Sequence, residues 1–179
     1  WLARNGMRRF GLADQVIGVG RLRNPLWPPT IVGSISHDRE VCMVALQQQN
    51  RAAGIGIDVF YLPQRHGRMQ ELLPAFMTST AELALAAKMA ATAAVAPLVL
   101  DPAALLFSLK EAMREALSFR LDDFIDLREL ELVAISATAR NTCYHGDAGG
   151  FSYAGQAVDG SVFATVTGDY LLTAAKVYR

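Results

Sequence analysis

The chain has 179 residues, of which 52% are hydrophobic and 19% are charged, and its formal net charge is zero. This length and composition suffice to bury the core of one large domain or of two small lobes, and they exclude a disordered chain. The balanced charge gives no indication of a nucleic-acid or membrane-surface partner, so a few placed basic groups must hold any anionic ligand.

Cysteine usage and hydropathy indicate a cytoplasmic protein. Cys42 and Cys143 form neither a disulfide framework nor a zinc motif. The Ala-rich segment 83–100 has the length of a membrane span, but it contains Lys88 and Pro97 and follows a capping signal, so we expect a helix of a soluble protein. No signal peptide is apparent, and a first residue other than Met leads us to expect further residues upstream.

The first third of the chain predicts one helix, a long loop and several strands. Residues 4–11 have the spacing of a short basic amphipathic helix, and the loop-like segment 11–29 is rich in Gly, Pro and Arg. Residues 32–38 indicate a small-residue strand or turn. The apolar run 40–48 predicts a strand, and 53–60 predicts its hairpin partner across a polar turn.

The strand predicted over 53–60 carries an unusual pair of glycines. Because side chains alternate along a strand, Gly54, Gly56, Asp58 and Phe60 share one face. The two glycines bare the backbone on that face, so another element or a ligand can approach it closely.

Two helices are expected in the middle of the chain. Ser79 and Glu82 have the spacing of a capping box, which predicts a helix that runs to about residue 95 and stops at Pro97. Asp101 followed by Pro102 is a strong start signal for a second helix, which runs to about residue 120.

The second of these helices is amphipathic. Apolar residues recur on one side with helical spacing, at positions 105, 106, 109, 112, 113, 116 and 117. The pattern places four charged residues together on the opposite, polar side, namely Lys110, Glu111, Arg114 and Glu115.

After residue 120 the pattern changes to strands. We expect them over 130–135, 151–158, 161–166 and 171–177. The order of a strand hairpin, then helices, then strands again favours an α+β fold of two lobes with a cleft between them.

Several polar residues are candidates for chemistry, although each has an ordinary structural alternative. Asp58 ends a strand and can be a turn residue, Glu111 can be a solvated surface residue, and His37 can belong to a strand-end turn. The hydroxyls and imidazole of the segment 34–37 can also face a phosphate. The sequence contains no zinc spacing, nucleophile elbow, Walker loop or dinucleotide fingerprint.

Four motifs follow one another in the order Arg23-Asn24-Pro25-Leu26-Trp27-Pro28, Gly33-Ser34-Ile35-Ser36-His37, Gly56-Ile57-Asp58 and Leu106-Phe107-Ser108-Leu109-Lys110-Glu111-Ala112. The ordered set resembles the 4′-phosphopantetheinyl transferases of the enterobactin-synthetase and surfactin type, over nearly the whole chain. The resemblance implies a pseudo-twofold α+β fold of two lobes, residues 1–100 and 101–179, with the active site in the cleft between them.

The resemblance also implies a reaction. Family members use Mg²⁺ and move the 4′-phosphopantetheine group from coenzyme A to a serine of an apo acyl, peptidyl or aryl carrier protein, and they release adenosine 3′,5′-bisphosphate. The Trp27-Pro28 pair favours the enterobactin-type branch, and hence siderophore or other secondary-metabolite synthesis. The family expectation is a monomer.

Individual roles follow from the matched positions. The resemblance makes Asp58 and Glu111 the carboxylates that bind Mg²⁺, and it makes Glu111 the base that takes the serine proton, directly or through a water. It makes Lys110 a catalytic residue that contacts phosphate. The positions implied to bind coenzyme A are Arg23, Ser36, His37 and Lys110.

Two positions depart from the family pattern. Phe60 stands where the family usually has a second acid after the strand aspartate, and Glu115 stands where it usually has a lysine. The first removes one metal ligand, which water can replace at Mg²⁺. The second puts a carboxylate one helical turn from Glu111 and tends to raise its pKa. Two alternatives therefore remain: a degenerate member that binds coenzyme A or a carrier without transfer, and an enzyme that acts on a different phosphate ester.

Overall fold

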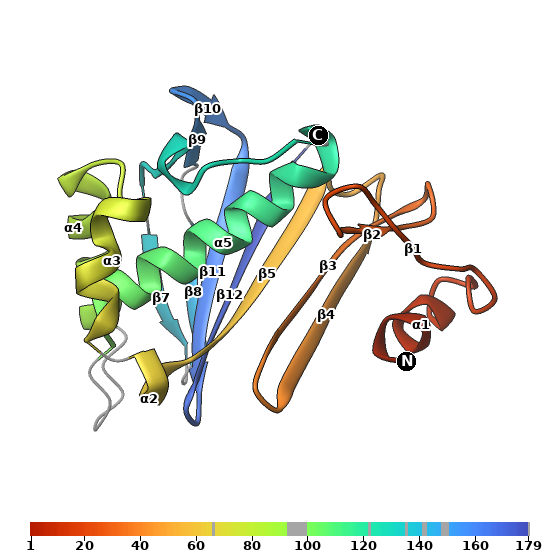
Figure 1. Ribbon diagram of the computed structural model, residues 1–179, viewed down its shortest axis with the longest axis horizontal. Helices are drawn as coiled ribbons and strands as arrows, with labels where there is room; N and C mark the ends of the chain where they lie inside the picture. The colour runs from red at the N-terminus through yellow and green to blue at the C-terminus, as the bar shows by residue number, and fades with distance from the viewer. Residues whose placement is uncertain are drawn as a thin grey trace.

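The protein has a mixed α+β fold built around one long helix and one antiparallel sheet. The computed structural model describes residues 1–65, 67–92, 100–121, 123–134, 136–140, 143–147 and 151–178. Helix α5 (Pro102–Leu121) lies across the sheet (Figure 1). The sheet has the strand order β5 (Gly54–Tyr61), β12 (Tyr170–Val177), β11 (Gly160–Thr167), β8 (Cys143–Asp147) and β7 (Ser136–Arg140).

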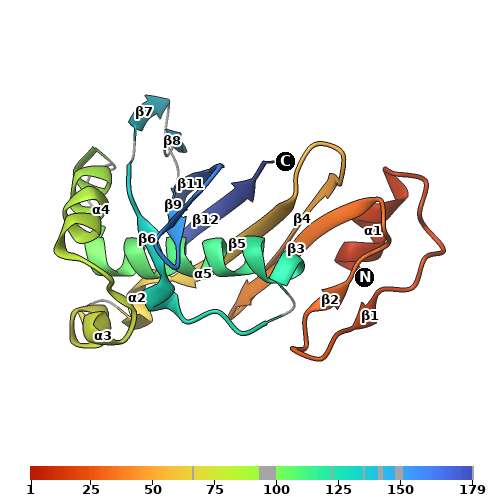
Figure 2. The ribbon, with the colours of Figure 1, turned by 90° about the horizontal axis from the view of Figure 1, so that it is seen from above.

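The first 48 residues form a separate unit at one end of the molecule (Figures 1 and 2). Its own small hydrophobic cluster contains Ala3, Met7, Trp27 and Ile31. Its elements are α1 (Leu2–Arg8), β1 (Gly18–Val19), β2 (Pro25–Leu26), β3 (Ile31–Asp38) and β4 (Val41–Gln48). The predicted basic helix near the N-terminus is thereby confirmed.

The predicted pairing of the first strands is wrong. β4 pairs along its whole length with β3 rather than with β5. β5 pairs instead with β12, from Gly54 opposite Val177 to Tyr61 opposite Tyr170. The tight turn lies between β3 and β4, where Arg39 adopts a left-handed conformation with φ of 50°. The strand expected over 32–38 therefore exists. The hairpin consists of β3 and β4, whereas the polar turn at 49–51 had suggested a hairpin of β4 and β5.

The large hydrophobic core joins α5 to the main sheet and to the helices before it. The apolar stripe of α5 is buried as its spacing predicts, and Asp101 Oδ1 caps the helix by accepting from the Ala103 amide at 3.0 Å. Three more helices cover one end of the sheet: α2 (Leu62–Arg65), α3 (Arg68–Phe76) and α4 (Thr80–Thr92). The expected end of α4 near Pro97 falls within 93–99, outside the described residues.

The remaining elements form a second, three-stranded sheet. It consists of β10 (Gln156–Val158), β9 (Phe151–Tyr153) and β6 (Leu130–Leu132), which follows the 3₁₀ helix η1 (Leu127–Glu129). The single strand predicted over 151–158 is in fact a hairpin, because Ala154 and Gly155 both have positive φ and reverse the chain. The sequence patterns did not predict α2, α3, β7 and β8, and the predicted loop 11–29 contains the short strands β1 and β2.

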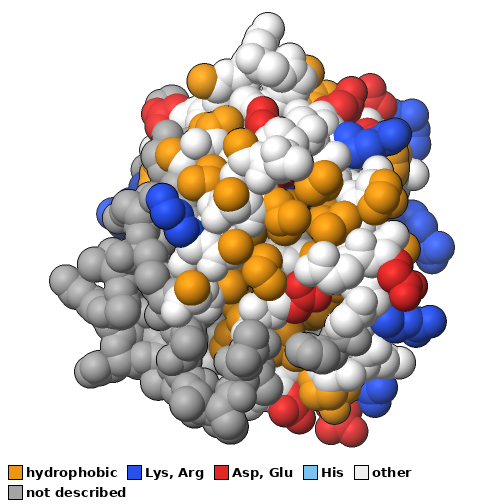
Figure 3. All heavy atoms as spheres, turned by 90° about the vertical axis from the view of Figure 1, so that its left-hand side faces the viewer, with side chains coloured by type: hydrophobic (Ala, Val, Ile, Leu, Met, Phe, Trp, Pro, Cys, Tyr) orange, Lys and Arg blue, Asp and Glu red, His pale blue; other side chains and the backbone are white. Residues whose placement is uncertain are grey.

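Figure 3 shows the side of the molecule that carries α3 and α4, where hydrophobic side chains reach the surface among charged ones. Leu72 on α3 is half exposed. Among the described residues, no helix combines the length and the apolar character that crossing a membrane requires.

Two glycines bring α5 unusually close to β5. A Cβ atom added to Gly56 would overlap the carbonyl oxygen of Ala112, and one added to Gly54 would overlap that of Ala116. Both carbonyl groups belong to the backbone of α5, so neither can move aside as a flexible side chain could. The bare face predicted for β5 therefore receives the helix, and the residues that follow on this face lie directly beneath α5.

We predict that Gly56→Ala destabilises the fold by roughly 3 kcal/mol, the upper range for overpacking a close-packed interior. The added methyl group must push α5 away from β5. Gly18→Ala is the matched control, because its Cβ would meet only the side chain of Leu26 at an ordinary 3.4 Å. Urea unfolding measures both, and a Gly56→Ala variant as stable as the parent protein would contradict the packing described.

Candidate active site

The edge of β5 that faces the first unit is bound by side chains rather than by a neighbouring backbone. Three residues of β3, at every second position, accept hydrogen bonds from alternate amides of β5. These bonds run from the Ile57 amide to Ser34 Oγ (3.1 Å), from the Val59 amide to Ser36 Oγ (3.0 Å), and from the Tyr61 amide to Asp38 Oδ2 (2.9 Å). We call this set of contacts the β3–β5 seam.

Asp58 lies between the seam and α5. Its Oδ1 accepts a hydrogen bond from Ser36 Oγ at 3.3 Å, and its Oδ2 accepts one from Ser108 Oγ of α5 at 2.6 Å. Burial raises the pKa of this carboxyl above its ordinary value, while the two serine hydroxyls and the positive charge of Arg65 oppose the rise. The side chain is thus fixed by two elements that lie far apart in the sequence.

Glu111 brings a second carboxylate to the same region. Burial raises its pKa, the ion pair with Arg114 one turn along α5 opposes the rise, and the negative charge of Asp58 adds to it. Asp58 and Glu111 therefore repel each other electrostatically. The charge of Asp58 thus makes Glu111 harder to ionise, and a cation close to both groups would offset this repulsion.

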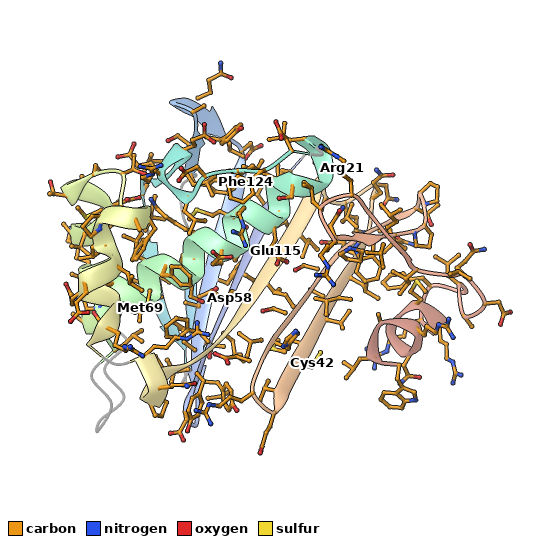
Figure 4. The ribbon with its side chains drawn as sticks, viewed as in Figure 1. Arg21, Cys42, Asp58, Met69, Glu115 and Phe124 are labelled. Carbon is orange, nitrogen blue, oxygen red and sulfur yellow. The ribbon has the colours of Figure 1, made fainter. Side chains whose placement is uncertain are left out.

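Glu115 of α5 is a third carboxylate in this region. Figure 4 shows it with Asp58 between the helix and β5. Its Oε2 accepts a hydrogen bond from Ser34 Oγ, so it touches the seam. Burial raises the pKa of Glu115 to about 7, and the charges of Asp58 and Glu111 contribute to the rise. The sequence predicted that Glu115 raises the pKa of Glu111, whereas in the structure the charge of Glu111 raises the pKa of Glu115.

The raised pKa of Glu115 predicts a stability that falls as the pH rises. In the unfolded chain the group loses its proton near its ordinary pKa of 4.5, whereas in the folded chain it keeps the proton until about pH 7. The native state thus binds more protons in this window, so the free energy of unfolding falls between pH 5 and pH 7.5, by up to roughly 3 kcal/mol.

Glu115→Gln should flatten this pH dependence, because an amide does not titrate. Unfolding curves at several pH values measure the slope, and Glu40→Gln, an exposed residue in the β3–β4 turn, should leave it as in the parent protein. Parallel slopes for Glu115→Gln and the parent would show that Glu115 is ionised over this window.

Lys110 lies in the interior, not on the exposed polar face that the helical pattern predicted. Its side chain and that of Glu82 are both 0% exposed, and the two form an ion pair of 2.8 Å. The ammonium group also donates to the Phe76 carbonyl (2.7 Å), to Thr78 Oγ1 (2.9 Å) and to the Leu127 carbonyl (3.2 Å). The correction has a simple cause: residues 110 and 111 point about 100° apart around a helix, so they face different neighbours.

Glu82 extends this buried network to two segments of backbone. It accepts from the Ser79 amide (3.3 Å), as the predicted capping box requires, from the neighbouring Thr78 amide (2.5 Å), and from the amide of Leu132 in β6 (3.3 Å). Burial lowers the pKa of Lys110, and Glu82 opposes the shift. The pair therefore anchors α5 to the start of α4 and to β6. Contact between Lys110 and a phosphate would require its ammonium group to leave four protein partners.

We predict that Lys110→Met lowers the free energy of unfolding by about 3–5 kcal/mol, because it leaves the carboxylate of Glu82 buried without its counter-charge. The double variant Lys110→Met/Glu82→Gln should lose less than the sum of the two single variants. Arg68→Met, at an exposed position of α3, should change stability by less than about 0.5 kcal/mol. Additive losses in urea unfolding would contradict the coupling.

An open pocket of about 330 Å³ is lined by Glu115 and by Arg114, the ion-pair partner of Glu111. Ser34 and Glu115 form its wall on the side of the seam, and the exposed side chains of Arg23 and Phe124 stand at its rim. Figure 4 places Phe124 alongside α5, on the segment that turns back after the helix ends. The pocket combines apolar walls, two arginines and two carboxylates. A ligand with both polar and apolar parts fits such a lining.

The structure brings some predicted site residues together and separates others. Ser36 contacts Asp58, and Glu111 acts on Asp58 electrostatically. Arg23 lies in the lining of the pocket rather than beside the two carboxylates. His37 is exposed and, by strand alternation, lies on the face of β3 opposite Ser36.

The sequence predicted Ser36 as a coenzyme A contact, but it did not predict the contacts of Ser34 with β5, of Ser108 with Asp58 or of Glu82 with Lys110. Ser34 and Ser36 alternate along β3, a spacing that could have indicated a shared face. Ser108 precedes Glu111 by three residues, which places both on one side of α5. No local signal points to Glu82, because its partner Lys110 lies 28 residues away.

The donor set limits what kind of metal site is possible. Among the residues that the structure describes, no group of three or more His, Cys, Asp or Glu side chains could hold a metal ion. Asp58 and Glu111 alone suit Mg²⁺, which accepts one or two carboxylates and takes its remaining oxygens from water and phosphate. Their mutual repulsion fits the presence of such an ion.

Two segments of the chain match known families. Residues 1–47 match the 4′-phosphopantetheinyl transferase N-terminal domain, and residues 54–175, more than half of the chain, match the 4′-phosphopantetheinyl transferase superfamily. The chain belongs to the 4′-phosphopantetheinyl transferase superfamily. The boundary between the two matches falls between β4 and β5, where the first unit ends.

Curated relatives extend this result. The chain is 33% identical over 117 residues to "Enterobactin synthase component D" of Salmonella typhimurium (strain LT2) and 31% identical over 117 residues to the protein of the same name from Salmonella typhi. Each match covers 65% of this chain and 44% of the relative. The chain therefore spans less than half the length of these curated relatives.

Proposed function

We propose that this transferase moves the 4′-phosphopantetheine group of coenzyme A to a serine of an apo carrier protein, with release of adenosine 3′,5′-bisphosphate. The observation that carries the proposal is the pair of partly buried carboxylates, Asp58 and Glu111, in a member of this superfamily, together with the open pocket that Arg114 and Glu115 of the same helix line. We place the reaction in the cytoplasm, in agreement with the free cysteine Cys42.

In this proposal the two lobes are related by a pseudo-twofold axis and the reaction takes place in the cleft between them. The division into residues 1–100 and 101–179 stays a prediction, and the fold offers a second place of division between β4 and β5. A monomer remains the expectation. The relatives' names suggest a carrier of siderophore synthesis as the acceptor.

The carboxylates have distinct roles in the proposed reaction. Asp58 and Glu111 would hold Mg²⁺, which, when bound, neutralises charge on the pyrophosphate. Asp58 is the more rigid ligand, because two serines fix its oxygens. Glu111 can also take the proton of the attacking serine, since burial moves its pKa up towards the range of an effective base.

The basic residues support this assignment in different ways. Arg114 is paired with Glu111 and holds that carboxylate in place until substrate enters. Arg23 and Ser36 remain candidates to contact coenzyme A, one at the pocket and one at Asp58. We assign Lys110 to the positioning of Glu111 through α5, because the ammonium group is fully enclosed. His37 stays a prediction, although it lies on the other face of β3.

A second candidate function is the binding of coenzyme A or of a carrier without transfer. The observation that favours it is Glu115, a carboxyl in the pocket wall where the family usually has a lysine. A negative charge at this point disfavours an anionic substrate whenever the group is ionised.

The proposal is tested by incubating the protein with coenzyme A, Mg²⁺ and an apo carrier domain and then weighing the carrier by mass spectrometry. We expect the mass of one phosphopantetheine arm to be added. Asp58→Ala and Glu111→Ala should each slow transfer by at least about 100-fold, the scale of lost general-base or charge stabilisation. Glu71→Ala, on the exposed side of α3, is the matched control and should leave the rate unchanged.

Two outcomes would overturn the proposal. One is full activity of Asp58→Ala, which would remove this residue from the site. The other is a parent protein that binds coenzyme A in calorimetry but modifies no carrier, which would support the binding function instead.

A further inference from the structure

Helix α2 turns back directly after β5 and places Arg65 over the ring of Phe60. The guanidinium carbon lies 4.8 Å from the centre of that ring, within the range of a cation–π contact. Phe60 is only 1% exposed, and its ring also packs against Phe107 of α5 at 6.0 Å between centres. The ring is therefore a fixed platform for the arginine.

A second contact fixes the direction of the guanidinium group. Arg65 Nη2 lies 3.4 Å from Asp38 Oδ2, and the same oxygen accepts the amide of Tyr61 at the end of the β3–β5 seam. The arginine side chain remains 41% exposed. Because a guanidinium group carries five N–H donors, the contact with Asp38 leaves donors that a ligand can reach.

The position of Phe60 brings the guanidinium group of Arg65 towards the carboxylates of Asp58 and Glu111. Asp58 and Phe60 share a face of β5 and are about 6–7 Å apart along the strand. In agreement, the charge of Arg65 opposes the rise in pKa that burial causes in both Asp58 and Glu111. A phosphate that approaches the carboxylates from the exposed end of β5 would meet Arg65.

We propose that Arg65 is a phosphate-binding residue of this site and that it holds the pyrophosphate group of coenzyme A beside Asp58 and Glu111. The inference rests on the proposed function for the identity of the ligand. A guanidinium group binds two phosphate oxygens at once, and its fixed plane makes this contact specific. Phe60 stands where the family usually has a second acid, and in this chain its ring supports the guanidinium group of Arg65.

The alternative is a surface ion pair between Arg65 and Asp38 without a role in binding. Such pairs contribute little to stability, with a median of about 0–1 kcal/mol. That alternative predicts no change in the affinity for phosphate compounds when Arg65 is replaced.

Titration calorimetry with inorganic pyrophosphate, coenzyme A and dephospho-coenzyme A, each with and without Mg²⁺, separates these two roles. We expect Arg65→Gln to weaken the binding of all three ligands about tenfold, as is typical of one lost bond to a charged group. Arg68→Gln, an exposed arginine three residues on, is the matched control for net charge and should bind like the parent protein. Arg65→Lys should recover only part of the affinity, because an ammonium group lacks the planar pair of parallel N–H donors of a guanidinium group.

Several results would overturn the inference. Unchanged binding by Arg65→Gln, an equal loss in Arg68→Gln, or no binding of pyrophosphate and coenzyme A to the parent protein would each do so. A loss confined to coenzyme A, with dephospho-coenzyme A unaffected, would assign Arg65 to the 3′-phosphate instead. If Arg65→Gln has a lowered melting temperature, Asp38→Asn serves as the second variant: it releases Arg65 from its ion pair, and its binding should equal or exceed that of the parent.

The readout also separates this inference from the proposed function. A parent protein that binds pyrophosphate through Arg65 but transfers no arm to any carrier would leave Arg65 assigned and remove the transfer reaction. A protein that transfers the arm at the same rate and with the same KM for coenzyme A after Arg65→Gln would leave the function in place and remove Arg65.

Discussion

The close approach of α5 to β5 determines most of the site. It is possible because Gly54 and Gly56 have no side chains where the helix backbone passes. Ser108 can then reach Asp58, and Glu115 can reach Ser34 across the same gap. The helix cannot rotate away from this arrangement, because Lys110 on its other side is bound within the interior to Glu82. The site is thus fixed from the sheet and from the core at the same time.

The contrast between Lys110 and Glu111 shows how two adjacent charges come to differ in function. Lys110 is fully enclosed and compensated by one carboxylate and several carbonyl groups, so its charge acts within the fold. Glu111 faces Asp58, and its ion pair with Arg114 is partly exposed, so a ligand can compete for it. The same helix therefore supplies an anchor and a reactive group from neighbouring positions.

Local patterns predicted α1, α4, α5 and the approximate ends of several strands, because caps, apolar periodicity and strand alternation act over a few residues. Pairing depends on residues far apart, and this is where prediction failed: β5 pairs with β12, more than 100 residues later. The buried partner of Lys110 and the seam that holds Asp58 are also long-range. The stretch 136–147 was overlooked because its polar residues resemble a loop, although it forms β7 and β8.

The β3–β5 seam restricts the two strands unequally. The oxygens of Ser34, Ser36 and Asp38 bind amide groups of β5, and every residue except proline offers an amide. The bonded positions 57, 59 and 61 can thus change side chain without breaking the seam, whereas positions 34, 36 and 38 need a short acceptor. Over long divergence, substitutions at the contact should therefore accumulate on β5 and be rare on β3.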